Sequence, residues 1–153
     1  MVVYLDACCY SRPFDNRAHL AQERVRLEIT AIMDALEVCG VAGFPIVGSP
    51  ITVLEINQIK NDEKRLRVMG FYTSAITEEV PLTEDVKMRA KTLADDGLHE
   101  FDAYHVAFAE IFGINYLLTT DDRLLNACQK MDLLVNVINP LSFMEEYQKW
   151  RQY

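Results

Sequence analysis

Short apolar runs alternate with segments of helical periodicity along this chain of 153 residues. The runs are VVYL at 2–5, FPIV at 44–47, INYLL at 114–118 and LLVNVI at 133–138. Continuous apolar runs, unlike alternating apolar and polar residues, are typical of strands buried on both faces of a parallel sheet. Because helical patterns separate these runs, the sequence predicts a doubly wound α/β fold whose crossovers are right-handed.

Several residues mark the ends of the predicted helices. An apolar stripe over residues 25–36 predicts a helix that ends near Gly40. Ser49 followed by Pro50 predicts the start of another helix, because Ser caps a helix well and Pro fits its first position. Val80, which precedes a proline, predicts at most a minor edge strand.

The composition restricts the classes of function. The chain has 23 acidic and 15 basic residues and a formal net charge of −8, which argues against a broad basic surface for nucleic acid. No apolar stretch approaches the roughly 20 residues that span a bilayer, and the N-terminal run has no basic leader. We therefore expect a cytoplasmic protein that does not contact membranes, and a single domain over residues 1–153. The four cysteines form no CxxC pair and are expected to be reduced, mostly buried thiols.

Acidic residues follow the predicted strands, at the edge where parallel sheets bind ligands. Asp6 comes directly after the first run, and Asp121 and Asp122 follow the third run after two threonines. Glu55 lies one and a half turns into the helix after the second run, and Asp102 lies near the start of the helix before the third run; both helices are otherwise apolar. Carboxylates gathered at one edge repel one another unless cations lie between them, so the sequence predicts a divalent metal site.

Each of these residues also has a purely structural interpretation. Asp121 could serve only as a helix N-cap, whereas Glu55 and Asp102 are harder to explain, because acids among apolar neighbours are rarely buried without a partner. For His105 the pattern favours a satisfied core histidine, with a place lining the site as the alternative. Motifs of the GxGxxG, GxxxxGK[ST] and GxSxG types are absent, which argues against a dinucleotide site, a P-loop and a hydrolase elbow.

Four segments together resemble the PIN domain family, as found in VapC-like ribonucleases. They are YLDACCYSRPFD, SPITVLEI, GLHEFDAYHVAFAE and INYLLTTDDRLL. The resemblance implies a Rossmann-like, three-layer α/β/α sandwich whose central, mostly parallel sheet has four to five strands. It also implies hydrolysis of RNA phosphodiester bonds by two-metal in-line displacement, with Mg²⁺ or Mn²⁺ as the cofactor.

The resemblance also implies roles for individual residues. The catalytic metal ligands would be Asp6, Glu55, Asp102 and Asp121. Asp122 is a further candidate ligand, and Thr119 would order the loop before the last acid. Candidate contacts to the RNA phosphates are Arg12, Arg17 and Arg123.

Two classes of function remain open from the sequence. The first is a nuclease, which as a VapC-type toxin would have a cognate antitoxin. The second is a catalytically weak PIN-like module that binds RNA or protein, because a fold does not establish an activity. The family often forms homodimers, and large aromatic residues such as Trp150 near the C-terminus fit an interface.

Overall fold

The computed structural model describes residues 1–153 and contains one five-stranded sheet of order β3-β2-β1-β4-β5. All neighbouring strands are parallel, which confirms the predicted doubly wound α/β fold. The strands are β1 (Val3–Leu5), β2 (Ile46–Gly48), β3 (Glu78–Glu79), β4 (Tyr116–Leu118) and β5 (Asn136–Ile138). The edge strand β3 ends one residue before Val80.

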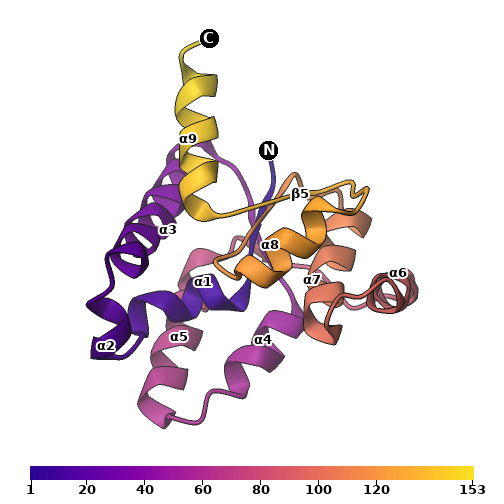
Figure 1. Ribbon diagram of the computed structural model, residues 1–153, viewed down its shortest axis with the longest axis horizontal. Coiled ribbons are helices and arrows are strands. Elements are labelled where there is room, and N and C mark those ends of the chain that lie inside the picture. The colour runs from indigo at the N-terminus through magenta and orange to yellow at the C-terminus, as the bar shows by residue number, and fades with distance from the viewer.

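Helices connect the strands and cover both faces of the sheet (Figure 1). They are α1 (Ala7–Ser11), α2 (Arg17–Leu20), α3 (Glu23–Ala42), α4 (Pro50–Asn57), α5 (Asp62–Ala75), α6 (Glu84–Asp95), α7 (Glu100–Ile111), α8 (Asp122–Gln129) and α9 (Pro140–Arg151), with a 3-10 turn η1 (Arg12–Phe14) after α1. None of the helices is both long and apolar enough to cross a membrane.

Two apolar clusters hold the three layers together. One cluster lies under α6, α7 and α8 and includes Tyr4 and Leu117. The other lies under α1, α3, α5 and α9 and includes Val3 and Leu5. Successive residues of β1 therefore point to opposite faces of the sheet, as expected for a buried central strand. All four cysteines are free and three of them are buried.

The predicted end of the long helix at Gly40 is wrong. Helix α3 continues to Ala42, and Gly43 ends it with a φ of +72°, in the left-handed region that favours glycine. The backbone N–H of Gly43 and that of Phe44 both bind the carbonyl of Cys39. Glycine is common just after the last residue of a helix, and both Gly40 and Gly43 fit that rule. The backbone hydrogen bonds that close the last turn form at Gly43.

A buried carboxylate that the sequence analysis did not identify ties α3 to the start of α9. Glu28 has no exposed surface. It accepts hydrogen bonds from Arg12 at 3.2 Å and from Asn139 at 2.7 Å, and Arg24 lies 3.6 Å away. Because Asn139 is the N-cap of α9, this network fixes where the last helix begins.

The strand order places the functional edge of the sheet between β1 and β4. The chain runs outward from β1 through β2 to β3, and then returns to add β4 and β5 on the other side. In open α/β sheets, ligands bind at such a reversal, beyond the carboxyl ends of the strands. Asp6 follows β1 and residues 119–121 follow β4, so these segments meet at the reversal.

Candidate metal centre

Four carboxylates from four segments line one cavity at the carboxyl edge of the sheet. Asp6 is the N-cap of α1, Glu55 lies on α4, Asp102 lies in the first turn of α7, and Asp121 is the N-cap of α8. The cavity has a volume of about 420 Å³, and Cys8 and Arg123 also line it. The structure thus brings together the four acids that the sequence analysis selected.

Thr119 connects Asp6 to the loop between β4 and α8 through two hydrogen bonds. Its hydroxyl donates a hydrogen bond to Asp6 Oδ2 at 2.9 Å and accepts one from the backbone N–H of Asp121 at 3.1 Å. The side chain of Asp121 in turn accepts from the backbone N–H of Arg123 at 3.0 Å. Asp121 therefore acts as an N-cap and also lines the cavity, so the two interpretations of this residue are compatible.

The electrostatics of the cavity show most clearly at Asp102. Burial, followed by the negative charges of Asp6 and Asp121, raises the pKa of Asp102 from 3.8 to about 6, although His105 and Arg123 act in the opposite direction. The Arg123 guanidinium lies 3.6 Å from Asp102 and 3.5 Å from Asp121, but its side chain is 62% exposed. The carboxylates are thus only partly neutralised by the protein, which is the situation that a bound cation would relieve.

His105 lies behind the acids and is completely buried. Its Nε2 contacts Glu55 Oε1 and lies 3.4 Å from Asp6 Oδ1, while its Nδ1 lies 2.5 Å from the hydroxyl of Tyr4. Burial alone lowers the pKa of an imidazole, but Tyr4, Asp6 and Glu55 raise the pKa of His105 well above its ordinary value. The favoured interpretation as a core histidine is therefore incomplete, because this buried residue also contacts two of the acids.

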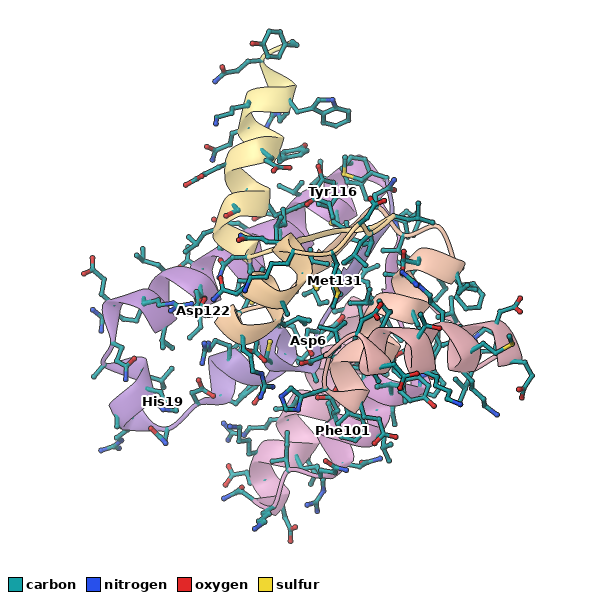
Figure 2. The ribbon with its side chains drawn as sticks, turned by 45° about the vertical axis from the view of Figure 1, so that its right-hand side comes forward. Asp6, His19, Phe101, Tyr116, Asp122 and Met131 are labelled. Atoms are coloured by element: carbon teal, nitrogen blue, oxygen red, sulfur yellow. The ribbon has the colours of Figure 1, made fainter.

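Three of the sequence candidates lie away from the cavity. Asp122 is 59% exposed and forms two 2.7 Å hydrogen bonds with Arg24, so it faces α3 (Figure 2). Arg12 pairs with Asp15 and Glu28. Arg17 is exposed at the start of α2 and does not line the cavity. Of the three candidate arginines, only Arg123 lies next to the acids.

A larger cavity lies elsewhere on the protein. It has a volume of about 1140 Å³ and lies between α3 and α5, where Phe44 and Phe71 contribute to an apolar lining. Two charged side chains, Glu37 and Arg67, reach it, and no group of acids converges there. We therefore assign the site by its chemistry and not by its volume.

The ligand atoms of Asp6, Glu55 and His105 lie within 4.8 Å of one another, which is close enough to share a metal ion. The sequence predicts both acids as metal ligands, and it places His105 at the site only as the less favoured alternative. A signal was present in the spacing, because His105 follows Asp102 by three residues and so lies on the same side of α7.

Solved structures of low sequence identity share the fold. The VapBC2 structure from Rickettsia felis, bound to a DNA fragment from its promoter, matches with a TM-score of 0.61 at 14% identity, over 91% of this chain and 98% of that chain. VapC20 of Mycobacterium tuberculosis, described as a toxin that cleaves the sarcin-ricin loop, matches with a TM-score of 0.57 at 12% identity, over 82% and 94%. VapBC-1 of nontypeable Haemophilus influenzae matches with a TM-score of 0.55 at 14% identity, over 92% and 99%.

The sequence itself matches a known family over most of its length. No curated protein matches the chain, but the PIN domain family matches residues 3–130. This range contains all four acids of the cavity, Thr119 and His105. The chain therefore belongs to the PIN domain family.

Proposed function

We propose that the protein is a metal-dependent ribonuclease that hydrolyses RNA phosphodiester bonds and acts as a VapC-type toxin. The observation that carries the proposal is the convergence of Asp6, Glu55, Asp102 and Asp121 on one cavity at the reversal of the sheet. Membership of the PIN domain family supports a nuclease, and the VapC structures of similar fold support a toxin.

The residues of the cavity fit Mg²⁺ or Mn²⁺. All four converging groups are carboxylates, and oxygen ligands suit these hard cations. Burial, followed by the negative charges of Asp6 and Asp121, raises the pKa of Asp102, and a cation bound beside this carboxylate would favour its ionised form. When bound, Mg²⁺ or Mn²⁺ polarises the phosphate and lowers the pKa of a bound water, which are the contributions that in-line displacement of a phosphodiester needs.

The protein's own residues then have separate tasks. The four carboxylates hold the cation, and Thr119 keeps Asp6 and the Asp121 loop at a fixed separation. Arg123 is exposed at the rim of the cavity, where its guanidinium can contact an RNA phosphate. With a net charge of −8, the protein binds RNA through this local contact and not through a wide basic surface.

We also propose protein partners. The structures from Rickettsia felis and Haemophilus influenzae are VapBC assemblies, which supports a cognate antitoxin for this chain. A homodimer is a separate proposal, and it rests on the aromatic residues of α9, where Trp150 is 59% exposed.

A cleavage assay with adjacent variants tests the proposal. The wild type is incubated with a mixed pool of single-stranded RNA and Mn²⁺ and is expected to produce fragments with 5′ phosphates. Asp6→Asn and Asp121→Asn are expected to abolish cleavage, and Asn at position 121 preserves the N-cap. Asp122→Asn, which changes the next residue but lies outside the cavity, is the matched control and is expected to retain activity.

The outcomes separate the candidate functions. Cleavage that persists in Asp6→Asn would indicate a contaminating nuclease or a different site. RNA binding without cleavage by the wild type would refute the enzyme and support the binding module.

A further inference from the structure

Three segments around the metal centre each supply one acid and one further polar side chain, at a spacing that puts both on the same side. The pairs are Tyr4 of β1 with Asp6, which follows β1 in extended backbone, Thr52 with Glu55 on α4, and His105 with Asp102 on α7. A spacing of two residues in a strand and of three in a helix gives a shared face. The three polar partners meet beneath the acids, where all are buried.

The buried partners form a continuous chain of hydrogen bonds. The hydroxyl of Tyr4 lies 2.6 Å from Ser49 Oγ, 3.1 Å from Thr52 Oγ1 and 2.5 Å from His105 Nδ1. Ser49 is also the N-cap of α4, the helix that carries Glu55. The network therefore links the start of α4 to α7 through the side chain of a central strand.

The surroundings of His105 determine which nitrogen carries a proton toward the acids. Nε2 faces Glu55 Oε1, which it contacts, and Asp6 Oδ1 at 3.4 Å. Ionised carboxylates accept hydrogen bonds and cannot donate them, so Nε2 must carry the hydrogen. On the other side, the hydroxyl of Tyr4 lies within hydrogen-bond distance of Nδ1, Ser49 Oγ and Thr52 Oγ1, and a hydroxyl can both donate and accept.

The position of the imidazole argues against a direct bond from His105 to the cation. Asp6, Glu55, Asp102 and Asp121 line the cavity, whereas His105 does not. Its Nε2 is covered by the two carboxylates, and its side chain has no exposed surface. The imidazole therefore supports the ligands from behind, as outer partners of metal ligands commonly do.

We propose that His105 is a positioning residue of the metal centre, whose Nε2–H holds the Glu55 carboxylate toward the cavity while Tyr4, Ser49 and Thr52 fix the imidazole. This inference rests on the proposed function, because it assigns a role toward the cation that the four acids hold. It explains why α7 presents a buried histidine one turn after Asp102, and why Tyr4 carries a hydroxyl into an otherwise apolar cluster.

Substitutions that keep or remove the donor test this role. His105→Gln retains an N–H that can reach Glu55, whereas His105→Leu retains the bulk but loses the donor. Calorimetric titration with Mn²⁺ alone is expected to show an affinity about 10- to 100-fold weaker for His105→Leu, the usual effect of removing an outer partner of a ligand. His105→Gln is expected to restore most of the affinity, which a purely structural role would not require.

Tyr4→Phe provides a second variant in case His105→Leu fails to fold. It keeps the ring in the core and removes only the hydroxyl, so its Mn²⁺ affinity is expected to change in the same direction by a smaller factor. If both His105→Leu and Tyr4→Phe fold and bind Mn²⁺ as tightly as the wild type, the positioning role is overturned.

Pulsed electron paramagnetic resonance of bound Mn²⁺ distinguishes support from ligation. In protein with ¹⁵N-labelled histidine, we expect no coupling of the strength that a directly bound nitrogen produces. A strong coupling that disappears in His105→Gln would make His105 a ligand and overturn the proposal. If the wild type binds no Mn²⁺ at all, the proposed function fails, and this outcome is distinct from tight binding that is indifferent to His105.

Discussion

Asp102→Asn is expected to stabilise the metal-free protein at neutral pH. In the folded state the pKa of Asp102 is about 6 instead of 3.8, because the side chain is buried and lies near Asp6 and Asp121. A carboxyl whose pKa is raised by folding destabilises the protein when it ionises, by about 1.4 kcal/mol for each tenfold change in proton affinity. The raised pKa thus corresponds to at most about 3 kcal/mol, and solvent at the cavity mouth reduces this to about 1.5 kcal/mol.

The sign of the pH dependence follows from the same pKa. Ionising Asp102 costs nothing below its ordinary pKa of 3.8, and the cost is fully present above about pH 6. We therefore expect the stabilising effect of Asn to be largest above pH 7 and to disappear as the pH falls toward 4. For a chain of this size, about 1.5 kcal/mol corresponds to a rise of about 3 to 6 °C in Tm.

Thermal melting in EDTA measures this effect, with Asp85→Asn as the matched control. Asp85 also lies in the first turn of a helix, α6, but it is exposed and does not line the cavity. Its substitution removes only the favourable interaction with the helix dipole, so a slight loss of stability is expected. With Mn²⁺ added, the wild type is expected to gain more stability than Asp102→Asn.

Two results would refute this reasoning. One is a Tm for Asp102→Asn in EDTA that is equal to or below that of the wild type at pH 7.5. The other is a stabilisation that persists unchanged at about pH 3, where the carboxyl is mostly protonated in both the folded and the unfolded state.

Other predictions concern single features of the structure. Thr119→Val removes the buried hydroxyl that joins two segments of the cavity, so we expect a loss of about 1 to 2 kcal/mol in the free energy of unfolding and weaker Mn²⁺ binding, both measured against Thr119→Ser. Asp122→Asn is expected to leave the Mn²⁺ affinity unchanged in calorimetry. A clear loss of affinity would indicate that Asp122 is a metal ligand after all. Glu28→Ala leaves the part-buried donors Arg12 and Asn139 without their acceptor, so urea denaturation is expected to show a loss of about 2 to 3 kcal/mol. Trp150→Lys is expected to reduce the mass measured by light scattering from that of a dimer to that of a monomer, and a wild type that is already monomeric would contradict the interface.

The fold was largely predictable because its strands are central and apolar. Strands β1, β2, β4 and β5 lie within the four runs that the sequence predicted or extend one residue beyond them. The edge strand β3 could be indicated only weakly, since its two residues, Glu78 and Glu79, are exposed and carry no apolar signal. Glu28 could not be recognised either, because a buried acid in an amphipathic helix looks like a solvated one until its partners from η1 and α9 are in place.

The acidic cavity was predictable to the extent that it depends on strand ends, and unpredictable where it depends on contacts between distant segments. His105 lies 50 residues from Glu55 and 101 residues from Tyr4 in the chain, so their hydrogen bonds leave no local pattern.

Asp121 and Asp122 show most clearly where prediction from the sequence ends, because both residues follow β4 and both are acidic. Asp121 is the N-cap of α8 and Asp122 is the first residue of the helix. Neighbouring residues of a helix point about 100° apart, so only one of the two side chains can face the cavity. The helix could have begun at either residue as far as capping rules can tell, since Asp is a good N-cap in both positions. Two contacts determine which side chain faces the cavity. The hydroxyl of Thr119 binds the backbone N–H of Asp121, and Arg24 of α3 holds Asp122 on the opposite side.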